Sequence, residues 1–374
     1  SSDLGGLTLG AINLSSSSTS RTLTILGTGN TTISGIVANG STATGSSIAI
    51  NSSGITTLSG ANTFAGGVTL TAGTLVVGNN AALGTGAADF SSNVTLNSDS
   101  SARTITNAIT FRNLTIGGTG ALNLSGTLTH TAANNTLTNN NSGGLTIGGL
   151  NLSGTATGRT MTLTGSGNTT ITGTIANGPS ATTGGLTINS TGLTTLSGSN
   201  SYSGDTTITS GTVVLSGTNS GSGSVILSAT SSVFKIGRTD SLVNGNLAGA
   251  SSSGNTGLVD LTAGGNYSIA SLGNSAANAR NLNFTNSSGL ATTLTFTSST
   301  NIISSGSNGS STLTNASANL DIVFNGVVDM SGTGSNTGLT LDGPGNFTFN
   351  GGLVGTNTSG TRNFIKNGAG TVTL

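Results

Sequence analysis

Short runs in which apolar and polar residues alternate recur along the whole chain. Residues 7–9 (Leu-Thr-Leu), 68–70 (Val-Thr-Leu) and 294–296 (Leu-Thr-Phe) are three of them. A period of two places alternate side chains on opposite faces of a β-strand. Clusters of Gly, Asn and Ser separate the runs, and these residues favour turns. The pattern predicts short strands roughly ten residues apart, which fits a sandwich, a barrel or a β-helix.

Composition supports an all-β chain without significant helix. The sequence contains no Glu and no Gln and only two Met, so most strong helix formers are missing. Gly and Pro together number 64 of 374 residues, which is below the roughly 25–30% typical of a disordered Gly/Pro tract. Thr, Val and Ile recur throughout, and these residues favour strands.

Charge and hydropathy exclude two classes of partner. The formal net charge is +0 and only 5% of residues are charged, so the chain lacks the basic surface that binds nucleic acid. The apolar runs are a few residues long, far short of the ~20 needed to cross a bilayer. We therefore expect no nucleic-acid partner and no membrane insertion by this segment.

Internal repeats favour a solenoid. Residues 5–78 align without gaps on residues 143–216, so that Arg21 falls on Arg159, and a partial third copy covers residues 321–374. This unequal spacing does not suit a propeller, whose blades recur at a fixed period of ~40–50 residues. A solenoid accepts inserted turns, because each turn contacts only its neighbours. We expect one continuous parallel β-solenoid over residues 1–374, and a third copy truncated in mid-repeat indicates a fragment of a larger repetitive protein.

The number of turns follows from the length of each turn. If a turn takes roughly 20–25 residues, the chain forms about 15–19 turns. The interior would then be filled by stacked Val, Ile and Leu, with backbone ladders joining successive turns.

Two segments share a more specific motif. Residues 58–75 and 196–213 both contain Ser-Gly, an Asn, an aromatic residue, Gly, an alternating strand and then Gly-Thr followed by an apolar residue. They resemble the passenger-associated transport repeat of bacterial autotransporters, and residues 366–374 resemble the opening of another copy. The resemblance implies a right-handed β-helical passenger that is secreted to the bacterial cell surface.

The motif residues have a structural interpretation of their own. Glycines allow turns where a Cβ would clash, and an Asn at a corner can bond its own backbone. The aromatic residue can stack between adjacent turns or fill one side of the core. The structural positions predicted in this way are Gly60, Asn62, Phe64, Gly66 and Gly73, and in the second copy Gly198, Asn200, Tyr202, Gly204 and Gly211.

Candidate catalytic residues are sparse. His130 is the single histidine and ends a strand-like run with no acid near it in sequence, which indicates a surface or strand-end side chain. The nine acids are all Asp and are scattered, and Asp321, Asp329 and Asp342 are the best candidates for a cluster formed by stacking. We predict no catalytic, cofactor or metal site.

The leading hypothesis is an extracellular structural or adhesive solenoid, part of a rod- or fibre-forming surface protein. One alternative is a filament subunit that stacks end to end, because open strand edges pair with other copies or with flanking solenoid segments. Host-surface or matrix glycans are a further expected partner. A glycan-active enzyme is the minor alternative, and it requires a cluster of acids.

Overall fold

The computed structural model describes residues 6–132, 136–242, 245–249, 256–273, 281–301, 310–330, 336–355 and 361–374. The fold is an all-β parallel solenoid, and no helix occurs within these ranges. The described residues form about 13 turns, fewer than the 15–19 predicted. Some coils are longer than the roughly 20–25 residues assumed for that prediction, since paired residues on successive coils are 28 residues apart at Thr300 and Val328 and 31 apart at Leu282 and Leu313.

The chain divides into two compact units, residues 1–184 with 190–192, and residues 185–189 with 193–374. The strands of the first unit are β1 (Leu7–Leu9), β2 (Ile12–Asn13), β3 (Thr22–Gly27), β4 (Thr31–Ile33), β5 (Val37–Ala38), β6 (Ser47–Leu58), β7 (Val68–Val77), β8 (Ala88–Ser98), β9 (Arg103–Ile105), β10 (Ile109–Gly117), β11 (Leu122–His130), β12 (Thr136–Asn139), β13 (Leu145–Asn151), β14 (Arg159–Gly165), β15 (Thr169–Ile171) and β16 (Ile175–Ala176).

The strands of the second unit begin with β17, most of which belongs to it. They are β17 (Gly184–Ser190), β18 (Thr194–Leu196), β19 (Ser199–Asn200), β20 (Thr206–Leu215), β21 (Thr218–Asn219), β22 (Val225–Leu227), β23 (Ser232–Ile236), β24 (Asn246–Gly249), β25 (Gly257–Leu261), β26 (Gly265–Ile269), β27 (Ser271–Leu272), β28 (Leu282–Asn286), β29 (Thr292–Phe296), β30 (Thr300–Asn301), β31 (Ser310–Asn315), β32 (Leu320–Phe324), β33 (Val328–Asp329), β34 (Asn336–Asp342), β35 (Asn346–Phe349), β36 (Leu353–Val354), β37 (Thr361–Lys366) and β38 (Val372–Thr373).

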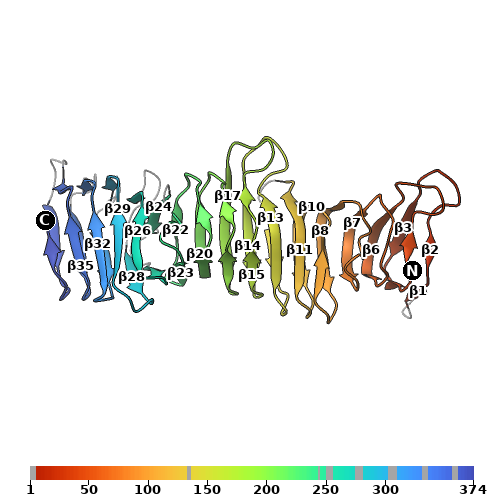
Figure 1. The fold of residues 1–374 in the computed structure, drawn as a ribbon, viewed down its shortest axis with the longest axis horizontal. Helices are drawn as coiled ribbons and strands as arrows, with labels where there is room; N and C mark the ends of the chain where they lie inside the picture. Colours follow the sequence, from red (N-terminus) through yellow and green to blue (C-terminus); the bar gives the residue numbers. More distant parts are fainter. Residues whose placement is uncertain are drawn as a thin grey trace. The chain divides into compact units, whose positions relative to one another are not determined.

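In the first unit, successive coils stack strand on strand in parallel register (Figure 1). Side chains at the same ladder position lie one above another, so an apolar residue repeated at that position forms a continuous internal column. One such column is buried throughout and consists of Ile48, Val68, Ala88, Ile109, Leu128, Leu150 and Ile175. The alternation in the sequence thus builds the core directly.

The outward positions of the same strands carry β-branched and amide side chains. One outward column carries threonine on five consecutive coils, and threonine favours the half-buried surface of a sheet. Its members are Thr74, Thr95, Thr115, Thr138 and Thr164.

The duplicated loops of the first unit fold alike. The hydroxyl of Ser15 donates to the carbonyl oxygen of Thr19 at 2.7 Å, and the hydroxyl of Ser153, which is 138 residues later, donates to that of Thr157 at 2.8 Å. Both serines are buried. The repeat found in the sequence therefore preserves a side-chain contact as well as the strand pattern.

The second unit is built on the same principle but stacks aromatic rings inside. Phe296, Phe324 and Phe349 occupy one ladder position on β29, β32 and β35. Their ring centroids are 5.0 and 4.9 Å apart, with interplanar angles of 16° and 9°. Offset stacking of this kind adds to the free energy gained by burial.

Candidate functional site

The motif glycines lie at corners where neighbouring coils approach closely. A Cβ on Gly60 would lie 2.1 Å from the carbonyl oxygen of Gly35, a distance that no side chain tolerates. Gly73 has a φ of +76°, and Gly211 repeats this conformation in the second copy at +81°. Of the remaining motif glycines, Gly66 has a similarly tight neighbour, Gly198 is buried and Gly204 is half-buried.

Asn62 connects three successive coils. Its Oδ1 accepts a hydrogen bond from the backbone N–H of Val37 at 2.8 Å, and its Nδ2 donates to the carbonyl oxygen of Ala82 at 2.6 Å. The expectation that this side chain bonds its own backbone is wrong, and the φ of Asn62 lies outside the left-handed region. The buried amide instead satisfies corner groups of the coils on either side. Asn200 is likewise buried, at the end of β19.

Phe64 and Tyr202 fill the core beside their corners. Phe64 is 0% and Tyr202 1% exposed, so neither ring is available to a ligand. The Tyr202 hydroxyl shares a hydrogen bond with Oγ1 of Thr206. Burial raises the pKa of Tyr202 to about 12, although the hydrogen bond to Thr206 opposes the shift. The motif residues therefore lie at tight corners or in the core, where they contribute to the fold.

His130 ends β11, as expected, but it is fully buried. Its Nδ1 lies 3.0 Å from the carbonyl oxygen of Leu152, which can only accept, so Nδ1 carries the proton. Nε2 is buried and has no hydrogen-bond partner within the described ranges. Desolvation lowers the pKa of His130 and the positive charge of Arg159 lowers it further, whereas the hydrogen bond to Leu152 raises it. His130 is thus a neutral core residue.

The three acids named as the best candidates for a cluster lie apart. Asp321, Asp329 and Asp342 lie on β32, β33 and β34, which belong to three different sheets. The Asn346 amide donates to Asp321 Oδ1 at 2.8 Å, and the Gly343 N–H donates to Asp342 Oδ1 at 2.8 Å. Over the described part of the chain, no group of three or more His, Cys, Asp or Glu side chains could hold a metal ion. The minor alternative, a glycan-active enzyme with a cluster of acids, therefore receives no support from the placement of these three residues.

One buried acid was not singled out by the sequence. Asp260 on β25 is 6% exposed, and its Oδ2 lies 3.5 Å from Nζ of Lys235 on the preceding coil. Thr285 and Ser287 on the following coil donate hydrogen bonds to the same carboxylate. Asp260 therefore has a structural role, because its carboxylate oxygens bond to the coils on either side. The sequence feature that could have indicated its burial is its position inside the apolar run 258–261.

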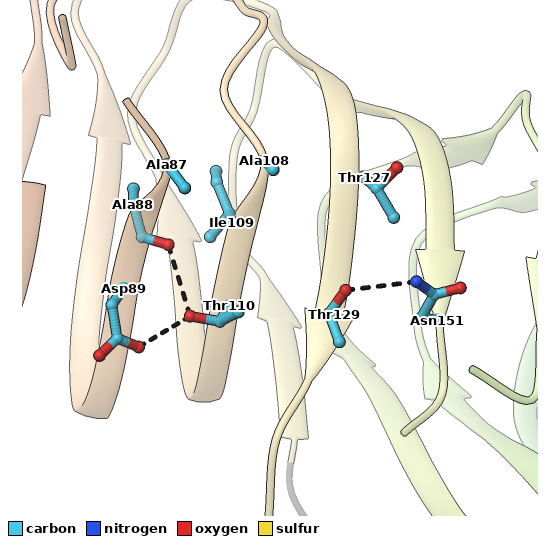
Figure 2. Close-up of a pocket in the computed structure, with 9 residues that line it drawn as sticks. All are labelled: Ala87, Ala88, Asp89, Ala108, Ile109, Thr110, Thr127, Thr129 and Asn151. Carbon is cyan, nitrogen blue, oxygen red and sulfur yellow. Dashed lines mark hydrogen bonds between the residues drawn. The ribbon is translucent and has the colours of Figure 1, made fainter. Parts of the chain in front are cut away.

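The first unit also carries an open hollow of about 350 Å³ on its outer face. It extends over β8, β10, β11 and β13, and Figure 2 shows the side chains that line it. Its apolar floor includes Ala87 and Ala108, and a polar column follows it, formed by Asp89, Thr110, Thr129 and Asn151. We call this hollow the ladder groove.

Two hydrogen bonds order the polar column of the ladder groove. The Thr110 hydroxyl donates to Asp89 Oδ1 at 2.8 Å, and Asn151 Nδ2 donates to Thr129 Oγ1 at 3.3 Å (Figure 2). The four side chains are half-buried. Sequence reasoning counted Asp89 only among the scattered acids, because 21 residues separate it from Thr110 and the register was unknown.

Comparison with known proteins identifies the motif. Residues 51–77 and 186–215 match the family model of the passenger-associated-transport-repeat, and these ranges contain both segments singled out in the sequence. No curated protein and no solved structure matches the chain. Within the described ranges there is no helix of the length and hydropathy that a membrane crossing requires. The chain thus carries two passenger-associated transport repeats within a parallel β-solenoid, a combination consistent with the passenger of a bacterial autotransporter.

Proposed function

We propose that this chain is a surface-displayed, non-catalytic segment of a secreted passenger, with a structural or adhesive role. The observation that carries the proposal is the pair of passenger-associated transport repeats at residues 51–77 and 186–215. Repeats of this kind belong to autotransporter passengers, which implies export to the cell surface.

The mechanism of such a segment is geometric. Backbone groups of each coil bond to the coils on either side, which makes the stack stiff, and outward Thr, Ser and Asn side chains supply many weak polar contacts. Only 5% of the residues are charged, so these contacts depend little on ionic strength.

Surface display is tested on cells that produce the full-length protein. Antibodies raised against the purified chain are applied to intact and to permeabilised cells. We expect labelling of intact cells, and protease added outside the cells should remove it. Labelling that appears only after permeabilisation would refute the proposal.

Electron microscopy of the purified chain at two concentrations distinguishes an adhesive segment from a filament subunit. Separate particles at both concentrations support a segment that is displayed singly and adheres through its outer faces. Filaments longer than one chain support the alternative, a subunit that pairs with other copies through its strand edges.

A further inference from the structure

We propose that the ladder groove binds an extended, neutral polysaccharide chain lying along the stack of coils. This inference deepens the proposed function by naming a ligand class for the adhesive role. It rests on the proposed function in one respect, which is that a chain displayed on the cell surface meets glycans. The site consists of the floor, Ala87 and Ala108, and the column Asp89, Thr110, Thr129 and Asn151.

The distance between successive side chains of the polar column favours a polymeric ligand with a similar repeat. Asp89 pairs with Thr110, Thr110 with Thr129, and Thr129 with Asn151, so the four side chains stand on consecutive rungs. Neighbouring strands are about 4.8 Å apart, and the four rungs therefore cover about 14 Å. A pyranose ring with its equatorial linkage advances by nearly the same distance as one rung. Because successive sugars of such a chain are turned by about 180°, every second sugar presents the same hydroxyls, and it does so to every second side chain of the column.

A peptide fits this surface less well. An extended peptide advances by about 3.3 Å per residue, which does not match the rung spacing. Peptides also bind sheets by pairing with a free strand edge, whereas the groove lies on a face, where the backbone groups of β8, β10, β11 and β13 are paired with neighbouring coils. Recognition on this face must come from side chains.

The column retains hydrogen-bonding capacity that points outward. Thr110 occupies only Oδ1 of Asp89, and no described residue bonds to Oδ2. Thr129 accepts from Asn151, so its own O–H is available to donate, and Asn151 Oδ1 is available to accept. Adjacent hydroxyls of a sugar can donate to the carboxylate and to the amide oxygen, and can accept from Thr129.

The floor and the charge define the ligand further. Ala87 and Ala108 are exposed, and their small side chains leave the hollow open to the apolar face of a sugar ring. Asp89 is the one charged side chain that lines the groove, so it repels anionic polymers and favours neutral ones. No aromatic ring lines it, so we expect millimolar affinity that comes mainly from hydrogen bonds.

The test uses the whole purified chain and two neutral probes, cellotetraose and chitotetraose, with binding followed by NMR titration. We expect at least one probe to bind, and a tetramer to bind more tightly than the dimer of the same sugar. Ala108→Trp fills the groove and should abolish binding. Asp89→Asn should weaken it by about tenfold, because a hydrogen bond to a charged group is lost.

Thr115→Trp is the matched control. Thr115 is also on β10 and also points outward, but it belongs to the threonine column, away from the groove. This variant should keep wild-type affinity, and the circular dichroism of both Trp variants should match the parent. A variant that loses its fold is replaced by Ala87→Leu, which narrows the same floor.

Three results would overturn the inference. They are no binding of either probe at millimolar concentration, binding that survives Ala108→Trp in a folded protein, and tighter binding of polygalacturonate than of the neutral probes. Surface labelling of intact cells together with any of these would refute the groove alone and leave the proposed function in place.

Discussion

At the scale of single residues, burial of His130 makes the stability of the fold depend on pH. His130 is the one histidine in the sequence, and histidine is the side chain whose ordinary pKa lies closest to neutral pH. Burial lowers the pKa of His130 in the folded protein below the value of about 6.5 expected when the chain is unfolded. Below about pH 6.5 the unfolded chain therefore binds a proton that the folded chain does not, so stability falls as the pH falls toward the folded pKa.

We predict that His130→Leu removes this acid sensitivity. The variant loses the hydrogen bond to Leu152 and is less stable at neutral pH, but its stability should change little between about pH 7.5 and about pH 5. The wild type should lose stability over that interval. Urea midpoints at the two pH values measure the difference. An equal loss in both proteins would show that another group is responsible.

Asn62 is the second residue whose contribution can be isolated. Replacing it with Leu leaves the N–H of Val37 and the carbonyl of Ala82 without their partner at a buried corner. We expect a loss of about 2–6 kcal/mol in the free energy of unfolding, because two groups are orphaned and each costs about 1–3 kcal/mol. Urea denaturation measures it, with Asn51→Ala at an exposed position of β6 as the control. Equal midpoints for the two variants would contradict the connecting role of Asn62.

At the scale of elements, the aromatic stack of the second unit joins three strands. Phe324 on β32 is sandwiched between Phe296 and Phe349 and is 1% exposed. Phe324→Ala should lower the free energy of unfolding by about 3–5 kcal/mol, since it removes a buried ring and leaves a cavity. The control is Val323→Ala, at the neighbouring half-buried position of the same strand. Chemical denaturation followed by circular dichroism compares them, and a similar loss in both would show that the stack adds nothing beyond strand pairing.

The sequence predicts elements better than contacts between them, and particular residues show why. The alternation gave the strands, and in residues 128–130 it even places His130 on the inner face with Leu128, although its polarity suggested a surface position. The ladder groove could not be predicted from the sequence. Paired residues on successive coils are 19 to 31 residues apart, so the sequence does not show which residues lie side by side. The role of Asn62 depends on the same unknown register, since its partners are 25 and 20 residues away.

At the scale of the whole molecule, a solenoid is stabilised by contacts between neighbouring coils, so whole coils should be removable where half coils are not. Thr95 and Thr115 occupy the same ladder position on consecutive coils. Deleting residues 96–115 therefore joins Thr95 to Ile116, which takes the place of Leu96, and each remaining side chain keeps its inward or outward direction. Deleting residues 96–105 instead removes part of a coil and displaces its corners.

We predict that the protein lacking residues 96–115 folds with the circular dichroism of the parent and unfolds cooperatively at a somewhat lower urea concentration. The cause of the lower midpoint is the loss of one interface between coils along with the residues that formed it. The protein lacking residues 96–105 should lose cooperative unfolding in the first unit, because core side chains no longer meet across the ladder. If both deletions were equally damaging, the coils would not be independent units of stability, and the unequal spacing of the repeats would need an explanation other than the gain and loss of whole coils.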